Sequence, residues 1–340
     1  MPAFNPTRYS LGSNAKPANT EPKHSVKTSS STKLIKLLHE IPTKNKSRTD
    51  NSSSAAKLAN NSVPKKPLLV YVFGRGGRLG NKMFQYAAGY GIARMNNRSA
   101  VTHLTNFDMM WHLFANLSIH REMPPPYLEY ISEKRYGTYN RKFEKLPEVN
   151  VGLYGFYQSW KYFQKYEREL RTEFTLNDAL RKRASDHLLR IAQMYNKNSA
   201  MPKRNITFVG VHVRRGDMVR IPAFRVASRS YILRAMQNFR RNFTRVHFVI
   251  CSDDIPWCKQ NLGQQKNVSF SESKSANVDF AILSLCNHTL STIGSFSWWV
   301  SWMAGGVTTY YTPFAEKWSR EYLQVTVGDH FLPNWIPMSD

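Results

Sequence analysis

Cysteine is scarce in this chain, acidic side chains are outnumbered, and long apolar runs are missing. Its 340 residues contain three cysteines, which excludes a disulfide framework and a zinc site made of cysteine alone but leaves one bridge plus a free thiol open. No segment is long and apolar enough to cross a bilayer, and no signal-peptide core follows the N-terminus. Zinc-finger spacings, Arg-rich helices and RNA-binding aromatic signatures are also missing, so no nucleic-acid partner is expected.

Basic residues dominate the charge, with 48 Lys and Arg against 23 Asp and Glu and a net charge of +25. Residues 1–66 hold twelve of the basic and three of the acidic residues, so they carry +9 and the rest of the chain carries +16. A basic surface suits an anionic ligand. Because the nucleic-acid motifs are missing, the charge favours a phosphorylated small molecule.

The composition divides the chain into three parts. Residues 1–66 are rich in Ser, Lys, Asn, Thr and Pro, and predict a disordered stalk or tail because they offer little apolar surface to bury. A polar, Pro-containing loop at 196–205 predicts a boundary between an α/β domain at 67–204 and a second domain at 205–340. The second part alternates strands with helices, which indicates parallel βαβ units and a Rossmann-like sheet.

Hydrophobic periodicity gives the individual elements. Strands are expected at 67–73, 99–104, 151–157, 206–213, 245–251, 267–270, 288–293 and 307–311. Helices are expected at 82–96, 159–173, 177–195, 230–240, 256–262, 276–285 and 297–304. Residues 105–150 are expected to be irregular, and residues 312–340 to form a closing tail that packs back across the domains.

The stretch Thr207–Asp217 combines a buried strand with fixed positive charge. Its apolar half ends directly in Arg214 and Arg215, at the carboxyl end of the strand, where open α/β sheets bind ligands. Two guanidinium forks suit a diphosphate, and Gly216 permits a sharp turn or a close approach to the ligand. His212 faces opposite to its neighbours and can reach a polar ring. A charged loop tied by its own ion pair explains the pattern equally well.

A glycine-rich loop at 74–81 joins the first predicted strand to the first predicted helix. A dinucleotide-binding motif requires Gly where Leu79 stands, and a P-loop requires Gly-Lys-Ser/Thr where Gly80-Asn81-Lys82 stands, so NAD and ATP are excluded by motif. What remains is a tight turn from which Arg75 and Arg78 project, with Asn81 expected as the helix cap.

Polar residues follow three predicted strands and are expected to meet at one sheet edge: Arg214-Arg215, Ser252-Asp253-Asp254 and Gly294-Ser295. Two adjacent acids without a third ligand are more typical of a helix cap than of a metal site. Asp279 opens a predicted helix and can accept hydrogen bonds from a guanine ring.

Several motifs resemble, in order, those of the galactoside α-1,2-fucosyltransferases. They are Gly77–Ala87, Val211–Asp217, Phe248–Cys258, Asp279–Phe296, Trp302–Gly306 and Phe331–Trp335, spread over about residues 68–336. The resemblance implies a GT-B-like fold of two Rossmann-like domains with a cleft between them, an acceptor-side domain at 67–204 and a donor-binding domain at 205–340. It also implies transfer of fucose from GDP-fucose to the 2-hydroxyl of a terminal galactose on a glycan, with inversion, no cofactor and no metal.

Carried over by position, the resemblance assigns GDP-fucose to a set of residues in the second half. They are Arg214 and Arg215 for the diphosphate, His212 for the guanine side, Asp279 for guanine, and Gly294 and Ser295 for phosphate contacts. The chain departs from the family pattern at Lys82, where Gln is usual, and at Ser297, where Gly is usual.

Catalysis is expected to rest on Arg214, which would stabilise the leaving diphosphate, and on Asp217 as the base that accepts the acceptor proton. Orienting an arginine is an equally good role for Asp217. The acceptor side is assigned to Arg78, Asn81 and Gln85.

Asn-x-Ser/Thr sequons recur along the chain and favour the secretory pathway. The glycosylation candidates are Asn97, Asn116, Asn205, Asn242 and Asn267, besides Asn51 and Asn60 in the first 66 residues, whereas Asn287 is expected to be buried between a helix and a strand. Family members are usually type II membrane proteins of the Golgi lumen. This chain has a stalk-like stretch but no span, which leaves an isoform, an incomplete gene model or a soluble form open.

Two other functions stay open on the sequence alone. One is a fucosyltransferase of different linkage or acceptor, and the other is a catalytically weak glycan- or nucleotide-binding protein. Trp298, Trp299 and Trp302 suit either a sugar face or a core; their near-helical spacing favours the core.

Overall fold

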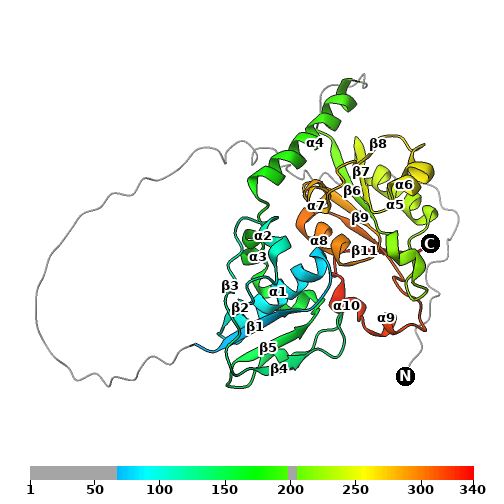
Figure 1. Ribbon diagram of the computed structural model, residues 1–340. Helices are drawn as coiled ribbons and strands as arrows, with labels where there is room; N and C mark the ends of the chain where they lie inside the picture. The colour runs from blue at the N-terminus through cyan, green and yellow to red at the C-terminus, as the bar shows by residue number, and fades with distance from the viewer. Residues whose placement is uncertain (1–66, 198–204) are drawn as a thin grey trace, which may run out of the picture. The chain divides into compact units, whose positions relative to one another are not determined.

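The computed structural model describes residues 67–197 and 205–340 (Figure 1). The predicted stalk 1–66, with Asn51 and Asn60, and residues 198–204 of the predicted boundary loop lie outside these ranges. The described residues belong to one compact unit, Val63–Asp340. They form two parallel sheets with helices, so the predicted α/β class with two Rossmann-like sheets is confirmed. The division into domains at residue 204 stays a prediction.

The first sheet has the strand order β3-β2-β1-β5-β4, and every neighbouring pair is parallel. Its strands are β1 (Leu69–Gly74), β2 (Ser99–Thr102), β3 (His120–Arg121), β4 (Glu129–Ser132) and β5 (Val151–Gly155). Its helices and 3₁₀ turns are α1 (Leu79–Met95), α2 (Asp108–Trp111), η2 (Arg141–Glu144), η3 (Trp160–Tyr162), η4 (Gln164–Tyr166), α3 (Glu167–Glu173) and α4 (Asp178–Lys197).

The second sheet has the order β11-β10-β9-β6-β7-β8, again all parallel. Its strands are β6 (Thr207–Val213), β7 (Val246–Ser252), β8 (Val268–Phe270), β9 (His288–Ser291), β10 (Thr308–Tyr311) and β11 (Ile336–Met338). Its helices and turns are η5 (Gly216–Arg220), α5 (Arg229–Asn242), α6 (Ile255–Leu262), α7 (Ala276–Ser284), α8 (Ser295–Ala304), α9 (Arg320–Leu323) and α10 (Val327–His330). This is the Rossmann order, which reverses between β6 and β9.

Strand β6 is apolar along its length because helices cover both of its faces. Val209, Val211 and Val213 pack with α5, whereas Gly210 faces α7, where an added Cβ would lie 3.0 Å from Leu283. His212 shares the second face with Gly210, as its position in the alternation predicts.

Helix starts agree with the sequence in one case and differ in another. Asp254 caps α6, accepting a hydrogen bond from the backbone N–H of Trp257, as predicted for the acidic pair. The prediction that Asn81 caps α1 is wrong, because that helix begins at Leu79 with Arg78 in the capping position. Asn81 is the third residue of the helix, within its first turn, and its side chain makes hydrogen bonds to other segments.

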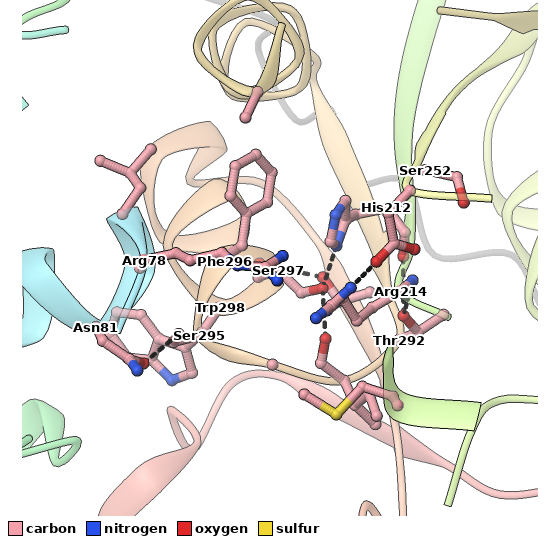
Figure 2. A pocket seen from close by; sticks show the side chains of 18 of the residues that line it. Arg78, Asn81, His212, Arg214, Ser252, Thr292, Ser295, Phe296, Ser297 and Trp298 are labelled. Carbon is pink, nitrogen blue, oxygen red and sulfur yellow. Dashed lines mark hydrogen bonds and ion pairs between the residues drawn. The ribbon is translucent and has the colours of Figure 1, made fainter. Parts of the chain in front are cut away.

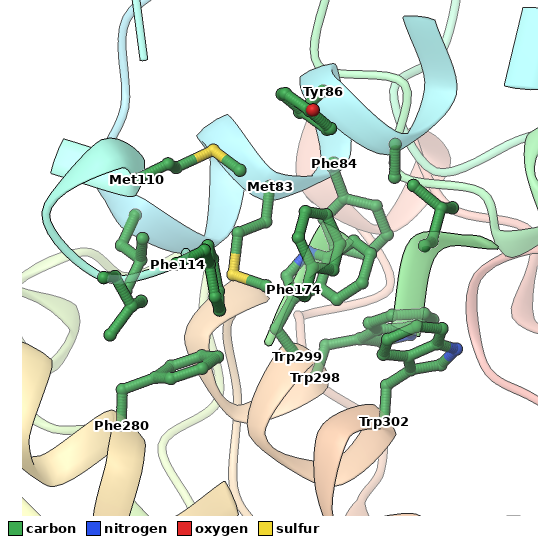
Figure 3. Packing of buried hydrophobic residues seen from close by; sticks show 14 of the residues in the cluster. Met83, Phe84, Tyr86, Met110, Phe114, Phe174, Phe280, Trp298, Trp299 and Trp302 are labelled. Atoms are coloured by element: carbon green, nitrogen blue, oxygen red, sulfur yellow. The ribbon is translucent and has the colours of Figure 1, made fainter. Parts of the chain in front are cut away.

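Aromatic side chains join α1 to α8 in the core (Figure 3). The ring of Phe84 lies 4.6 Å from that of Trp298 and 5.0 Å from that of Trp299, and Phe174 packs on Trp299 and Trp302. All three tryptophans are buried, which confirms the core role predicted from their spacing. Above this cluster, Gly80 brings α1 so close to α8 that an added Cβ would lie 2.5 Å from the backbone nitrogen of Phe296.

The last segment of the chain crosses from one sheet to the other, as predicted for the closing tail. It adds β11 to the second sheet beside β10. Before that, Asp329 accepts hydrogen bonds from Lys161 at 2.7 Å and from the backbone N–H of Tyr139 at 3.0 Å. Trp160 donates to the backbone oxygen of Phe331 at 3.1 Å.

The sequence missed some regular structure. Strands β3, β4 and β11 lie in stretches expected to be irregular, since two to four residues give too little alternation to detect. The helix expected at 159–173 is regular only in α3 and is preceded by two 3₁₀ turns. Asn287, expected to be buried, is exposed in the turn before β9, although its side-chain oxygen accepts from the backbone N–H of Phe208.

All three cysteines are buried and unpaired, so the optional disulfide is not formed. Among the helices of residues 67–197 and 205–340, none has the length and apolarity that a membrane span requires.

The close approach at Gly80 predicts a stability effect. Gly80→Ala is expected to lower the free energy of unfolding by about 1–3 kcal/mol, because the new methyl group meets backbone atoms that cannot rotate away. Gly76→Ala is the matched control, since no atom lies within 4 Å of its added Cβ. Urea unfolding of both variants checks this; an equal effect at the two positions would contradict it.

Candidate active site

A cavity of about 1310 Å³ lies at the carboxyl ends of strands from both sheets. One wall comes from the loop before α1 and the segment after β5, and the other from the ends of β6, β7 and β9. The cavity therefore includes the reversal point between β6 and β9, where α/β sheets of this order bind their ligands. Of the predicted site residues, it is lined by Arg78, Asn81, His212, Arg214, Asp217, Asp279, Gly294 and Ser295.

His212, at the end of β6, is held in one orientation (Figure 2). Its Nδ1 lies 2.5 Å from the hydroxyl of Ser297, which also donates to the backbone oxygen of Ile293. The imidazole packs against the ring of Phe296 at 4.7 Å. Burial, with the neighbouring charge of Arg214, lowers the pKa of His212 to about 3, so the ring is neutral at physiological pH. Ser297, which stands where the family pattern usually has Gly, thus has His212 as its hydrogen-bond partner.

Arg214 projects into the cavity between two carboxylates. Its guanidinium pairs with Asp217 and with Asp253, and its backbone N–H donates to the hydroxyl of Thr292 at 2.8 Å. Thr292 in turn donates to the backbone oxygen of His212 at 3.1 Å, which ties the end of β6 to the segment after β9. The main chain of Arg214 is therefore fixed by a hydrogen bond, and its guanidinium is held by ion pairs. Its side chain is only 14% exposed.

Arg215 is not brought to the cavity, contrary to the prediction of two guanidiniums side by side. Its guanidinium lies 3.9 Å from the ring centre of Trp257 and 3.2 Å from a carboxylate oxygen of Asp254. Its backbone N–H donates to Asp253 at 2.8 Å. Arg215 follows the end of β6 in a backbone conformation that is not extended, with φ −131° and ψ −73°, and its side chain turns toward Trp257.

The remaining residues that were predicted to bind the donor all line the cavity. Asp279 accepts hydrogen bonds from the hydroxyls of Ser271 at 2.5 Å and Ser273 at 2.7 Å and lines the cavity. Gly294 precedes α8 with φ +98°, a conformation that glycine adopts without strain. Ser295 opens that helix and faces the cavity.

Two of the three acceptor-side residues reach the cavity. The Arg78 guanidinium is largely exposed and lies 3.5 Å from Asp217. Asn81 accepts a hydrogen bond from Ser295 at 2.6 Å (Figure 2). It also accepts one from Gln158 at 3.0 Å, so it links three segments.

Gln85 does not reach the cavity, which corrects the expectation of a direct acceptor contact. It is fully buried on the inner side of α1. Its amide donates to the backbone oxygen of Arg75 at 2.8 Å, and the ammonium of Lys82 donates to the same oxygen at 3.1 Å. Burial lowers the pKa of Lys82. Both side chains hold the glycine-rich loop from beneath.

Sequence reasoning missed several residues that shape the cavity. Tyr136, Phe156 and Gln158 line it after strands β4 and β5. Glu133 fixes this region by accepting from the backbone N–H groups of Phe156 and Tyr157. Burial raises the pKa of Glu133 to about 7 despite these bonds. The sequence did indicate one of these residues, since Phe156 lies near the end of the predicted strand 151–157.

A family profile described as Glycosyl transferase family 11 matches residues 47–339. The chain belongs to this family. Within it, a galactoside alpha-(1,2)-fucosyltransferase 1 from Saimiri boliviensis boliviensis is 33% identical over 273 residues, covering 76% of this chain and 72% of the relative. A galactoside 2-alpha-L-fucosyltransferase SEC1 from Bos taurus is 32% identical over 278 residues, covering 78% and 73%.

The family 11 chain is also similar to solved structures. A crystal structure of the fucosyltransferase NodZ from Bradyrhizobium aligns with 69% of this chain and 93% of its own, at 14% identity and a TM-score of 0.46. A crystal structure of POFUT1 in complex with GDP aligns with 70% of this chain and 95% of its own, at 14% identity and a TM-score of 0.42.

The buried histidines predict how stability depends on pH. His212, with a folded pKa of about 3, and His247 and His330, each with about 4, stay neutral in the folded chain while their unfolded forms take up protons below about pH 6.5. The unfolded state then binds more protons, so stability falls as the pH drops from 6.5 toward 4, by up to about 1.4 kcal/mol per pH unit for each histidine.

Urea unfolding at pH 7 and pH 5 measures this effect. His212→Asn is expected to show a weaker pH dependence than the unchanged chain, whereas His120→Asn, at a position 75% exposed, is expected to match it. Equal slopes for all three proteins would contradict the neutral state assigned to His212.

Proposed function

We propose that this family 11 protein is an inverting fucosyltransferase, which transfers L-fucose from GDP-fucose to the 2-hydroxyl of a terminal galactose on a glycan. Its membership of the family and the names of its relatives support the reaction. The single structural observation that carries the proposal is Arg214. It provides a fixed positive charge in the cavity, at the reversal point of a Rossmann-ordered sheet.

Arg214 would act on the leaving group. As the bond between fucose and the diphosphate breaks, negative charge grows on the diphosphate, and a preorganised guanidinium stabilises that charge most strongly in the transition state. The backbone bond to Thr292 keeps the arginine in place before the donor arrives. Gly294 and Ser295, at the first turn of α8, would add contacts to phosphate oxygens, since a helix N-terminus favours anions.

The nucleoside would occupy the part of the cavity near Asp279 and His212. Asp279 has a carboxylate that accepts hydrogen bonds, the partner that the ring N–H and amino groups of guanine require. His212 is held by Ser297, and its lowered pKa keeps the imidazole neutral at physiological pH. Its ring edge would therefore present the same hydrogen-bonding groups to the nucleoside throughout that pH range.

Asp217 is proposed as the base that takes the proton of the acceptor hydroxyl. It lies at the cavity between the donor-side Arg214 and the acceptor-side Arg78, with one carboxylate oxygen toward each guanidinium. The same contacts suit the second role proposed for it, which is to orient Arg214. In either role Asp217 would act where the proposed donor and acceptor sides of the cavity meet.

No metal is proposed to take part. Asp253 is paired with Arg214, and Asp254 caps α6 and pairs with Arg215, so both carboxylates already have cationic or N–H partners. Arg214 would supply the positive charge that a divalent ion supplies in other transferases.

We propose the Golgi lumen as the location of this protein. The five candidate sequons, at Asn97, Asn116, Asn205, Asn242 and Asn267, are all exposed, as glycosylation requires. Membrane association is proposed from the family alone.

Incubation of the purified chain with GDP-fucose and lactose, with and without EDTA, tests the reaction. We expect GDP release at the same rate under both conditions, and methylation analysis that places fucose on the galactose 2-hydroxyl. Another linkage would favour a different fucosyltransferase. Saturable binding without GDP release would indicate a glycan- or nucleotide-binding protein, and an absolute Mn²⁺ requirement would overturn the proposed charge compensation.

Removal of the Arg214 guanidinium tests the mechanism. Arg214→Ala is expected to lower kcat by about 150-fold, or about 3 kcal/mol, the scale seen when one preorganised donor to a developing anion is removed. Arg220→Ala is the control, because Arg220 is an exposed arginine of η5 outside the cavity lining. Steady-state kinetics with saturating acceptor measures both; near-normal turnover of Arg214→Ala would refute the assignment.

A further inference from the structure

One corner of the first sheet exposes aromatic side chains instead of burying them. Strand β4 is one of the two edge strands of this sheet, with β5 beside it (Figure 1). Tyr130 on β4 is 68% exposed and Tyr154 on β5 is 49% exposed. With Phe73, Arg75 and Phe156 they form a set that we call the aromatic platform. Exposed aromatic side chains that lie together mark binding surfaces more often than isolated ones do.

The sheet register builds this platform. Phe73 and Tyr154 are partners across β1 and β5, so their side chains point to the same side of the sheet. Tyr130 is opposite Gly152, whose missing side chain lets the rings of Tyr130 and Phe73 meet at 5.4 Å. A Cβ at Gly152 would lie 2.7 Å from the Phe73 ring. The contact between these two rings therefore depends on glycine at this position.

Arg75 lies over two rings of the platform. Its guanidinium carbon is 5.5 Å from the ring centre of Tyr154 and 5.1 Å from that of Phe156. Within the described parts of the chain, no carboxylate lies within 4 Å of this guanidinium; Glu133 acts on it only at longer range. The backbone oxygen of Arg75 is held from below by Lys82 and Gln85. The guanidinium is thus positioned, exposed and free to donate hydrogen bonds.

The platform is continuous with the cavity. Phe156 belongs to both, and its ring contacts that of Tyr136, another cavity residue, at 6.3 Å. The order of the first sheet also reverses between β1 and β5, and Arg75 and Phe156 follow those two strands directly. Carboxyl-end positions at such a reversal are where parallel sheets bind ligands.

We propose that the aromatic platform binds the sugar residues that precede the terminal galactose of the acceptor glycan. The inference rests on the proposed function, which places that galactose in the cavity. Tyrosine and phenylalanine rings offer flat apolar faces to the C–H faces of pyranose rings, and Arg75 and the tyrosine hydroxyls offer hydrogen bonds to sugar hydroxyls. The occupant is a neutral oligosaccharide that leaves the cavity past Phe156.

The test compares a short with a long acceptor that end in the same β1,4-linked galactose: lactose, and the linear tetrasaccharide lacto-N-neotetraose. We expect the full chain to bind the tetrasaccharide more tightly than lactose in titration calorimetry. Tyr130→Ala and Tyr154→Ala are each expected to reduce that advantage by about fivefold, the effect of losing one aromatic contact. Tyr130→Phe keeps the ring but loses one hydroxyl, and is expected to keep most of the advantage.

Trp318→Ala is the matched control, since Trp318 is 71% exposed but lies outside the platform and the cavity lining. It is expected to leave the advantage unchanged. Thermal unfolding of every variant checks that the exposed substitutions leave the fold intact.

Calorimetry needs no turnover, so the two proposals can fail separately. A tetrasaccharide advantage that depends on the two tyrosines, without GDP release from GDP-fucose, would overturn the reaction but support the platform. Equal affinity for both sugars, or an advantage that survives both alanine substitutions, would overturn the platform even in an active transferase. Loss of self-association in Tyr130→Ala, with no sugar effect, would overturn it in favour of contact with a second copy of the chain.

Discussion

The contact between α1 and α8 is the constraint on which the site depends. Gly80 allows the two helices to approach until backbone nearly meets backbone, and Phe84, Trp298 and Trp299 fill the space behind. Buried aromatic side chains contribute both large apolar areas and edge-to-face contacts, which makes such a junction stiff. Because each helix follows a loop at the carboxyl end of its own sheet, this packing places the two loops on opposite walls of one cavity.

Electrostatic balance within the cavity follows from that placement. Arg214 is accompanied by Asp217 and Asp253, so its charge is compensated by carboxylates in the structure described. A bound diphosphate would have to compete with these carboxylates for the guanidinium. Asp217 is 45% exposed and belongs to an ion pair that solvent weakens, whereas Thr292 holds the backbone of Arg214 independently of charge. The arginine can therefore exchange partners without losing its position.

Much of the fold was predictable from the sequence because the decisive strands and helices are long and strongly patterned. The second sheet alternates elements of seven to fourteen residues at β6, β7 and α5, and its turn residues fall where polar side chains interrupt the apolar runs. The aromatic spacing of α8 also identified its tryptophans as core. Strands of two to four residues, such as β3 and β11, hold too few residues for a period to emerge.

For the site, the sequence predicted which strand ends contribute residues but not which way each side chain points. The sequence indicates that Arg214 and Arg215 follow a buried strand, but the direction of each side chain depends on the local turn and on Trp257, which is distant in the chain. Gln85 and Asn81 lie four residues apart on α1, yet one supports a loop from below and the other faces the cavity. Such differences are set by tertiary packing around the helix, which no local pattern records.

The closing segment ties residues that lie nearly two hundred positions apart, since Asp329 is held by Tyr139 and Lys161 while the strand that follows it completes the opposite sheet. Each half depends on contacts that the other supplies. Without the second half, Trp160 and Lys161 lose their bonds to Phe331 and Asp329. Without the first half, Trp298 and Trp299 of α8 lose their packing against Phe84. Neither half could therefore be replaced by that of a distant relative without loss of these contacts. Recombination that swapped either portion with that of a distant relative would have to carry the final thirty residues along with both of their docking surfaces.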